Sequence, residues 1–583
     1  MAKRGLFQSD QSYRFAMPVL AFVYIVMQIP SAKDMLGLGK GLTTDDAMRL
    51  AEVRDLLAGQ AWYDLFQHRV LPPDGLSMHW SRYIDAPMAA FMWLVQPFVG
   101  IDMAGRLLAI VWPLSLGLVM ILMTASLTRR LFGGQAAFLA VLCIICYEML
   151  SGSGFGVGGT DHHGVQIILM LGLARMITLP DRPMKSGLIG GALAALSLAI
   201  GLEMIFFIAL SGIILVASHI LDRNGASDRL MGFASGLAVA APLLMAGQLA
   251  PALWRVAVCD ALSPPLLAVT TAAFVASATL VAAGRIVHSP AARTALTAGI
   301  GAVVALVLLP VVQPCLAGPY TAMSEEIQRT VLAQIQEVKP AAFYFTTDGG
   351  RAIALFLPFY AATVLFAVSV IAKRGQGLVL LPFAILAAIL SFWQVRMMTM
   401  GLPVIAVAFG AAGVWAMNNP HRAVRIGGVV FVISVLLSKP LAVLYVKADF
   451  SGTAAAKAET KLGNQCSTIE QMAKLDQVPP AILFNPINFG PLILLSSHHS
   501  VTSAPYHRSA DAFVNGILPF AGDEANLRAA VERTKADYIV LCKDDSHGAK
   551  DSIGSQLAKG QLRPWLTEVP LGSSNLRLLK VER

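Results

Sequence analysis

Charged residues are scarce in this chain. Asp, Glu, Lys and Arg make up 14% of its 583 residues, whereas they make up about a quarter of an ordinary soluble protein. Disorder is excluded because 56% of the residues are hydrophobic, far more than a disordered chain leaves unburied. Gly-X-Y and heptad order are also missing, which excludes collagen-like and coiled-coil chains. The composition therefore predicts a polytopic α-helical membrane protein.

Cysteine is scarce too, with six residues and neither a Cys-X-X-Cys motif nor the His/Cys spacing of a zinc finger. Four cysteines lie in or beside apolar stretches, and we interpret them as small apolar residues: Cys143, Cys146, Cys259 and Cys315. Cys466 and Cys542 both lie in the polar C-terminal part. We predict a disulfide between these two, because an oxidising compartment would permit it.

Long apolar runs account for most of the chain. A helix needs about 20 apolar residues to cross the hydrocarbon layer, and thirteen stretches qualify or nearly so: roughly 13–30, 104–127, 135–150, 165–179, 187–201, 204–220, 230–250, 262–284, 295–312, 352–372, 377–392, 401–417 and 427–446. A further stretch, 86–99, is too short to cross comfortably. We expect it to form an interfacial or partly inserted helix.

Lys and Arg fall at the N-terminus and then in every second loop, as in the pairs Arg129–Arg130 and Lys373–Arg374. This alternation places the N-terminus in the cytoplasm, and an odd number of spans then places the C-terminal part outside. We therefore expect a protein of the bacterial inner membrane. The net charge of +9 follows from this loop asymmetry and does not indicate nucleic acid.

The predicted organisation has two parts. Residues 1–446 form the membrane domain, with long external loops at 31–85 and 314–350, and residues 447–583 form a small periplasmic α/β domain. In the second part we expect a helix at 523–534 and strands at 481–484, 492–495, 538–542 and 576–581, from their alternation and β-branched residues.

Two adjacent carboxylates, Asp45 and Asp46, follow the first predicted span. In a pocket at the membrane surface they would hold a divalent cation or act as a base. They also suit a helix N-terminus capped by Thr44 or Asp45. The two interpretations are compatible.

A glycine-rich segment, 151–164, ends on Asp161, His162 and His163. Asp and His two positions apart can both ligate one metal where the backbone turns. Taken alone, a flexible turn with a capping aspartate explains the segment equally simply.

Three charged residues lie near other ends of predicted spans. Glu337 in the second external loop is either a functional carboxylate or part of a solvated helix face, and Glu203 is either an interfacial acid or a pocket residue. Arg396 lies between two apolar spans. An arginine there faces a cavity, a partner or a phosphate, or it reaches the lipid headgroups.

Two external segments combine rings with basic groups. His79, Trp80 and Arg82 suit sugar stacking, although interfacial Trp and Arg also act as membrane anchors. In the C-terminal part, His507 and Arg508 close a His-rich loop. This loop would contact acceptor hydroxyls or phosphates, or it would pack at the membrane seam.

These features map to the external face, where a cation and an arginine would bind a lipid phosphate or diphosphate. In their order and placement they resemble the GT-C membrane glycosyltransferases, and among them the catalytic subunit of bacterial and archaeal oligosaccharyltransferases. The first aspartate motif of that family is similar to residues 44–59 with Asp45 as its key residue, and the second falls at 161–163. Its Thr-Ile-X-Glu motif resembles 334–337, and its phosphate-binding arginine resembles Arg396.

The resemblance implies transfer of a sugar or oligosaccharide from a polyprenyl phosphate or diphosphate donor. It implies a divalent metal, Mg²⁺ or Mn²⁺, held by Asp45, Asp161 and His163, with Asp45 or Glu337 acting on the acceptor. We expect the other substrate contacts from residues near these motifs and in the two external segments: Arg396, Asp46, Arg54, His79, Trp80, Arg82, His162, His507 and Arg508.

One departure concerns the acceptor. The family's Trp-Trp-Asp motif is missing from the chain, and Gln334 replaces the threonine of the Thr-Ile-X-Glu motif. We therefore expect an envelope glycan or glycolipid acceptor more readily than a peptide, although a protein stays possible. A transporter or flippase of a lipid-linked anion, and a non-catalytic scaffold of the same fold, are the alternatives.

Overall fold

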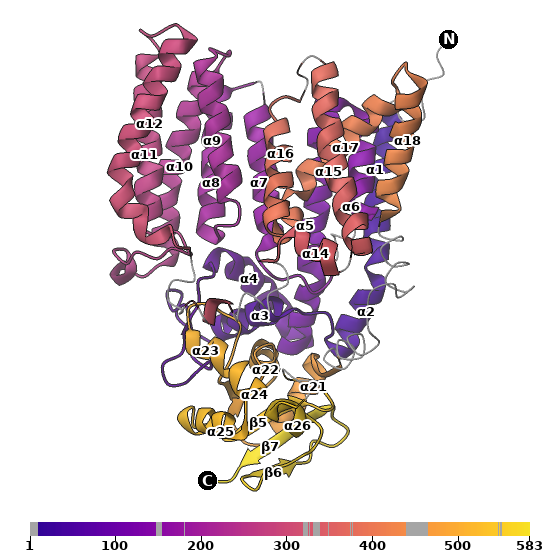
Figure 1. The fold of residues 1–583 in the computed structure, drawn as a ribbon, viewed down its shortest axis with the longest axis vertical. Coiled ribbons are helices and arrows are strands. Elements are labelled where there is room, and N and C mark those ends of the chain that lie inside the picture. The colour runs from indigo at the N-terminus through magenta and orange to yellow at the C-terminus, as the bar shows by residue number, and fades with distance from the viewer. Residues whose placement is uncertain are drawn as a thin grey trace.

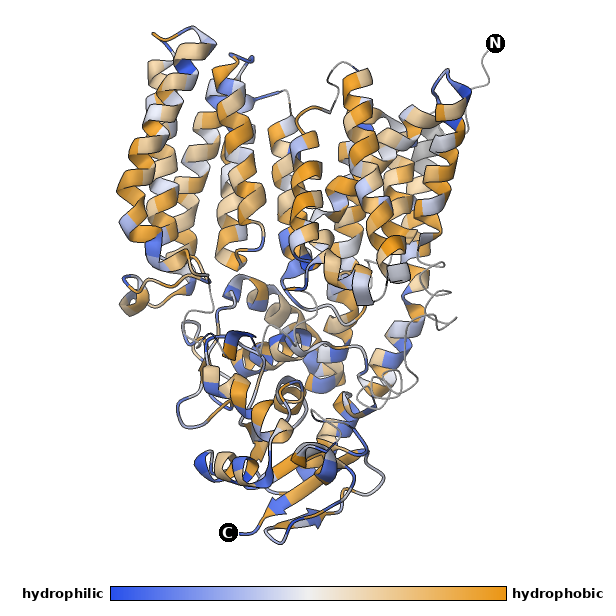
Figure 2. Cartoon of the chain, viewed as in Figure 1, coloured by the Kyte–Doolittle hydropathy of each residue, from blue (hydrophilic) through white to orange (hydrophobic). Residues whose placement is uncertain are grey.

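Long apolar helices lie side by side in the upper part of the molecule (Figures 1 and 2). The computed structural model describes residues 10–146, 154–179, 181–318, 325, 327–329, 338–347, 349–373, 375, 377–438, 465–545, 547 and 551–583. Within them, eight segments are long and apolar enough to cross a membrane: Ala16–Leu38, Ile101–Phe132, Pro183–Ile200, Ala226–Gln248, Pro264–Ala283, Pro290–Cys315, Ala352–Ala372 and Arg396–Met417. The protein is thus mostly helical with several candidate membrane spans.

The eight segments correspond to helices α1 (Asp10–Met27) with α2 (Ile29–Leu38), α5 (Ile101–Phe132), α8 (Pro183–Ile200), α10 (Ala226–Gln248), α11 (Pro264–Ala283), α12 (Pro290–Val312), α15 (Gly349–Ala372) and α17 (Arg396–Met417). The other five predicted spans coincide with shorter helices: α6 (Gly134–Cys146), α7 (His163–Thr178), α9 (Ile205–Ile220), α16 (Leu381–Trp393) and α18 (Arg422–Leu436). The total of thirteen spans stays a prediction.

Glycines bring helices α8 and α10 into very close contact. A Cβ added to Gly191 would lie 2.1 Å from the carbonyl oxygen of Phe233, and one added to Gly236 would lie 2.2 Å from that of Leu188. Small residues permit such an approach of two backbones, which is how helices associate where lipid removes the hydrophobic driving force.

Beneath the bundle lies a layer built from the first loop, which we predicted to be external, and from the helix that follows it (Figure 1). It contains α3 (Thr44–Leu57), α4 (Arg82–Val99) and a short hairpin of β1 (Phe66–Gln67) and β2 (Leu76–Ser77). Asp85 of α4 joins α3 and α4, because it pairs with Arg49 at 2.6 Å and with Arg82 at 3.1 Å in a buried cluster. The expected interfacial helix is therefore α4, placed below the membrane helices. The short α14 (Ala341–Thr347) lies at the lower edge of the bundle.

The C-terminal part contains a five-stranded sheet with the strand order β4-β3-β5-β7-β6. The strands are β3 (Ile482–Phe484), β4 (Ser500–Val501), β5 (Tyr538–Cys542), β6 (Leu566–Val569) and β7 (Leu576–Val581). β4, β3 and β5 are parallel, whereas β7 is antiparallel to both β5 and β6. Around the sheet lie α21 (Ile469–Ala473), α22 (Gly490–Ser496), α23 (Ala510–Asn515), α24 (Leu518–Ala521), α25 (Glu524–Arg533) and α26 (Ile553–Ala558).

Three of the four expected strands and the expected helix are present. The fourth strand, 492–495, was a wrong prediction, since these residues lie in α22. Pro491 lies in the first turn of this helix, where proline is well tolerated. Leu492–Leu495 are all buried, so the run is apolar throughout and does not alternate with polar residues as a half-buried strand does. β4 and β6 were not predicted.

The first external loop extends this sheet. Val70 forms a parallel bridge with Val501 of β4, in which Leu71 N donates to Val501 O and Val501 N donates to Arg69 O, both at 2.8 Å. Arg69 also donates to the carbonyl oxygens of Leu494 and Ser497 at the end of α22. The loop and the C-terminal part therefore form a continuous hydrogen-bonded structure.

Two disulfides are formed within the described chain. Cys466–Cys542 confirms the predicted bond. Cys259–Cys315 corrects the interpretation of these two residues as simple apolar side chains. They follow α10 and α12 at the same end of the bundle, where their Cα atoms lie 5.1 Å apart, a distance that suits a disulfide.

Candidate active site

The two adjacent carboxylates of the first loop have different surroundings. Asp46 is buried and forms a capping box with Thr43, which is the N-cap of α3 in place of the expected Thr44 or Asp45. Asp46 also accepts hydrogen bonds from the backbone N–H groups of Thr160 at 2.7 Å and Asp161 at 3.0 Å. Asp46 thus joins the first loop to the glycine-rich loop, and it leaves Asp45 facing a cavity.

The glycine-rich loop packs tightly against the backbone of the first loop. Gly158 has a φ of +102°, and a Cβ added there would lie 2.3 Å from the carbonyl oxygen of Gly41. Only glycine suits both the conformation and the close approach. The loop therefore brings Asp161 and the two histidines beside the start of α3.

Asp161, His162, His163 and Glu203 form one buried cluster. Asp161 lies 2.5 Å from His162 Nδ1 and contacts His163 Nδ1. Glu203 Oε1 lies 3.1 Å from His162 Nε2 and 3.9 Å from His163 Nε2. Glu203, in the turn between α8 and α9, is thus a pocket residue and not merely an interfacial acid.

The charges in this cluster favour a cation. Burial acts to raise the pKa of Asp161, but the two imidazoles outweigh it and hold that pKa well below its usual range. Burial acts to lower the pKa of His162, whereas Asp161 and Glu203 raise it to about 10. The two carboxylates therefore hold positive charge between them.

A divalent metal fits this donor set. His163 Nε2 is buried and has no hydrogen-bond partner among the described residues, and His162, His163 and Glu203 each offer a ligand atom within 4.8 Å of the others. Imidazole together with carboxylate suits Mn²⁺ or Zn²⁺, whereas Mg²⁺ prefers oxygen ligands. Of the expected set of Asp45, Asp161 and His163, this group contains His163, and it adds His162 and Glu203.

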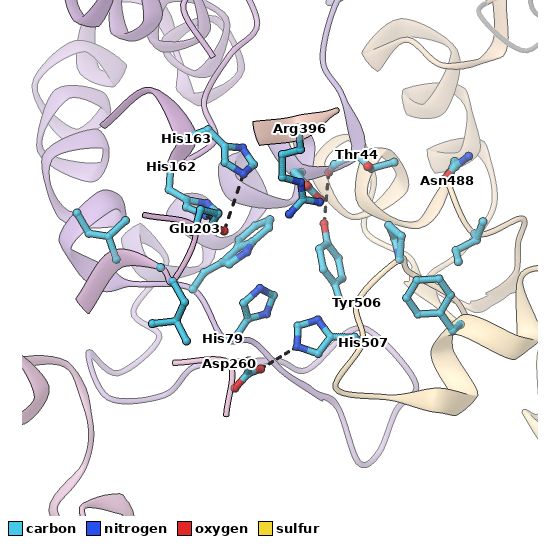
Figure 3. A pocket seen from close by; sticks show the side chains of 18 of the residues that line it. Thr44, His79, His162, His163, Glu203, Asp260, Arg396, Asn488, Tyr506 and His507 are labelled. Carbon is cyan, nitrogen blue, oxygen red and sulfur yellow. Dashed lines mark hydrogen bonds and ion pairs between the residues drawn. The ribbon is translucent and has the colours of Figure 1, made fainter. Parts of the chain in front are cut away.

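Arg396 lies at the start of α17 and lines two adjoining cavities (Figure 3). The larger, of about 670 Å³, reaches the C-terminal part, and the smaller, of about 470 Å³, reaches the glycine-rich loop and Tyr344, Val395 and Met400. Asp45 and His163 line both cavities as well. The carboxylate, the imidazole and the guanidinium therefore share one junction.

His79, Trp80 and His507 line the larger cavity, and the ring of Trp80 lies 6.4 Å from that of His162 between centroids. Figure 3 shows His79 and His507 in this cavity. Arg508 does not line it; its guanidinium holds Asp260 with bonds of 2.7 and 2.8 Å. Burial acts to raise the pKa of Asp260, but hydrogen bonds from Arg508 and His507 keep it well below its usual range. Tyr506 forms a side-chain hydrogen bond with Asp45, which adds to burial in raising the pKa of the phenol.

Besides Arg508, two further expected substrate contacts, Arg54 and Arg82, lie outside both cavities. Arg54 donates to the carbonyl oxygen of Leu495 at 2.7 Å and pairs with Asp102 at 2.8 Å, so it caps α22. Arg82 is buried in the cluster with Asp85 and donates to the carbonyl oxygen of Trp62. Both guanidinium groups thus contact protein groups away from the cavities, and their expected role as substrate contacts stays a prediction. Glu337 and the rest of its motif, 334–336, lie outside the described residues.

Asp260 and Tyr506 are cavity residues that the sequence did not single out for a role. Asp260 follows Cys259 in a short loop. Had the disulfide between Cys259 and Cys315 been predicted, it would have indicated that this loop is held in place. Tyr506 lay within the His-rich loop, directly before His507.

No protein-family model matches the chain, and no curated protein matches it. Solved structures do. The chain is similar to the Archaeoglobus fulgidus oligosaccharyltransferase tethered to an acceptor peptide, at 15% identity and a TM-score of 0.68, over 92% of this chain and 70% of that one. The chain has a GT-C-like, oligosaccharyltransferase-type fold.

Two further structures of the Archaeoglobus oligosaccharyltransferase agree in fold. The complex of AglB with an inhibitory peptide and a dolichol-phosphate matches at 15% identity and a TM-score of 0.67, over 91% of this chain and 69% of that one. The complex with Zn and sulfate matches at 14% identity and a TM-score of 0.64, over 96% and 73%. The chain thus spans about 70% of the length of these oligosaccharyltransferases.

Proposed function

We propose that the protein is a membrane glycosyltransferase that uses a polyprenyl phosphate or diphosphate sugar donor and acts on an envelope acceptor at the periplasmic face. The observation that carries the proposal is the junction at which Asp45, His163 and Arg396 line both cavities, with Asp161 and Glu203 beside it. These groups come from four separate segments. Nothing in the packing of the helices requires them to meet.

The smaller cavity suits the donor. Its wall combines Arg396 with the side chains of Tyr344, Val395 and Met400 at the lower edge of the helix bundle. A lipid-linked phosphate cannot leave the bilayer, so its charged group needs a partner at this depth. A guanidinium binds a phosphate through two parallel hydrogen bonds, and Arg396 would hold the donor in this way.

The larger cavity suits the acceptor. It is lined by rings and by neutral polar groups, among them Trp80, Tyr506 and Asn488. Such groups stack on sugar rings and exchange hydrogen bonds with hydroxyls, which supports a glycan or glycolipid acceptor. The peptide held by the similar Archaeoglobus enzyme makes a protein acceptor the second candidate.

The reaction we propose is a displacement at the anomeric carbon with inversion. The bond from this carbon to the phosphate oxygen breaks, and a bond to the acceptor oxygen or nitrogen forms. The acceptor proton passes to the Asp45 carboxylate, and the leaving phosphate stays paired with Arg396. Asp161, His163, Glu203 and Asp45 would hold the metal, which would supply positive charge near the leaving group.

The test is mass spectrometry of envelope glycolipids and glycoproteins from a deletion strain that carries the wild-type gene, Asp45→Ala, Asp161→Ala or Asp74→Ala. Asp74 is an exposed acid of the same loop and lines neither cavity, so it is the matched control. We expect one sugar-containing mass to disappear in the deletion, Asp45→Ala and Asp161→Ala strains and to return with wild type and Asp74→Ala.

Immunoblotting must show that the variants reach the membrane in equal amounts. If Asp45→Ala and Asp161→Ala keep every glycan that the deletion loses, the protein is a scaffold of this fold and the enzymatic proposal fails. If the lost glycan accumulates on its lipid carrier inside the cell, transport is the function.

A further inference from the structure

A second group of side chains that could hold a metal lines the larger cavity, to which Glu203, His162 and His163 also contribute. His79 comes from the first external loop, Asp260 from the loop between α10 and α11, and His507 from the C-terminal part. Figure 3 shows the three side chains gathered at one side of the cavity. Three segments distant in sequence thus deliver two imidazoles and one carboxylate to one place.

The ligand atoms of these three side chains lie almost close enough together to bind one ion. One ligand atom from each residue lies within 4.8 Å of the others. His507 Nε2 lies 2.8 Å from Asp260 Oδ2, and the rings of His79 and His507 are 4.6 Å apart between centroids. His79 Nδ1 is buried and has no hydrogen-bond partner in the part of the chain that the structure describes, and such a buried nitrogen needs a partner.

The carboxylate is held in position from behind. Arg508 donates to both oxygens of Asp260 and also to the carbonyl oxygen of Met78, the residue before His79. The disulfide at Cys259 ties the loop of Asp260 to the end of α12. Metal-binding carboxylates are commonly fixed by such outer hydrogen bonds, so this framework prepares the site.

We propose that His79, Asp260 and His507 bind a second divalent cation, with Zn²⁺ as the expected species. Two imidazoles and one carboxylate form an open zinc site that keeps one position for a further ligand. Zinc bonds of about 2.0–2.2 Å in tetrahedral geometry place ligand atoms about 3.4 Å apart. His507 and Asp260 would separate slightly to admit the ion, and His79 would move inward by about an ångström.

A third group with the same residue types does not meet these conditions. In Asp476, His498 and His499, the ring of His499 contacts the backbone through both nitrogens, since Nδ1 accepts from Ala481 N and Nε2 lies 2.9 Å from Leu475 O. With both nitrogens engaged, this histidine has no free position for a metal. The group is therefore a matched control on the surface.

The open position of the proposed ion faces the cavity that we assign to the acceptor. There it would bind an acceptor oxygen, either a hydroxyl or a phosphate. This role rests on the proposed function, whereas binding of the ion does not.

The experiment counts zinc in the full-length protein, purified in detergent, loaded with Zn²⁺, dialysed and analysed by mass spectrometry for metal content. We expect about two equivalents in wild type, one from His79, Asp260 and His507 and one from the cluster that contains Asp161, His163 and Glu203. His79→Phe, which keeps the ring volume, and Asp161→Asn should each lose one equivalent, and the double variant should lose both. His498→Phe should keep the wild-type content.

His507→Asn provides a second variant of the same site and should lose the same equivalent as His79→Phe. Gel filtration and the thermal unfolding midpoint show that each variant is folded. The proposal is overturned if both variants keep the wild-type zinc content, or if Asp161→Asn alone removes all the zinc. The zinc experiment measures metal content and not glycan transfer. The proposed zinc site can therefore be correct if the glycan test fails, and the proposed function can be correct if the zinc test fails.

Discussion

Asp45 and Asp46 show how neighbouring residues of one type divide between structure and chemistry. Asp46 is 4% exposed and accepts hydrogen bonds from Thr43, Thr160 and Asp161. Its carboxylate therefore stabilises the fold. Asp45 lies one helical position earlier and faces the cavity. The motif indicated that a carboxylate here matters, but the sequence could not say which one, because the donors for Asp46 come from a loop more than a hundred residues away.

Arginine was harder to interpret than aspartate. Arg396 lines the junction of the cavities, whereas Arg54 and Arg82 bind protein carbonyls and carboxylates. All three lie near predicted membrane surfaces in sequence. What separates them is the set of acceptors around each guanidinium. Arg54 donates to the end of α22, which is 441 residues away and has no local signature, whereas Arg82 pairs with Asp85 on its own helix α4.

His547 predicts a dependence of stability on pH. Its ring packs on Phe520 at 5.8 Å between centroids, and burial lowers its pKa to about 4. The unfolded chain has a histidine pKa of about 6.5, so it binds more protons than the folded chain between these values. Stability is therefore complete above about pH 6.5 and is lost as the pH falls towards 4, by about 1–3 kcal/mol.

The measurement is the thermal unfolding midpoint in detergent from pH 7 to pH 4. His547→Gln should flatten this part of the profile, and His498→Gln, at a more exposed histidine, should leave it as in wild type. An unchanged slope in His547→Gln would show that His547 does not cause the loss.

At the scale of elements, periodicity and length predicted most helices correctly, because an apolar run of membrane-spanning length has few alternatives. The error at 492–495 has the same origin: a short run buried on all sides looks alike in a strand and in a helix. The proline at 491 was the local clue. The interfacial position of α4 stays a prediction from the length of its apolar stretch.

The close packing of α8 on α10 predicts a strong effect of a single methyl group. Gly191→Ala places a Cβ 2.1 Å from a backbone oxygen of α10, so the helices must separate. We expect a loss of about 1–3 kcal/mol in stability, as for overpacking in a core. Gly212→Ala on α9, where nothing lies within 4 Å, should leave the unfolding midpoint unchanged or slightly raised. Equal midpoints for the two variants would contradict the close packing.

For the whole molecule, the order of weak motifs along the chain was more informative than any one of them. Asp45, the Asp161 segment and Arg396 are each explicable as caps, turns or anchors, yet together they predicted the fold that the Archaeoglobus structures share. The second disulfide could not be predicted, since Cys259 and Cys315 are brought together only by the packing of the helices. The place of Glu203 in the site could not be predicted either, since the packing of the helices also brings it to the two histidines.

The beginning of α1 and the C-terminus lie at opposite ends of the molecule along the helix axes (Figure 1), which agrees with the predicted cytoplasmic N-terminus and external C-terminus. Fusion of alkaline phosphatase after Arg583 should therefore give an active enzyme in a bacterial host, and fusion of a cytoplasmic fluorescent protein before Met1 should give fluorescence. An inactive C-terminal phosphatase in a correctly inserted protein would overturn the orientation.

The parallel bridge between Val70 and Val501 limits which segments can be exchanged between this chain and similar enzymes. A strand edge accepts a neighbour in one register, and a shift of one residue turns every side chain to the other face. A hybrid that takes its C-terminal half from one parent and residues 31–85 from another would mismatch this edge together with the arginine caps on α22. Grafts should therefore carry both segments as one cassette.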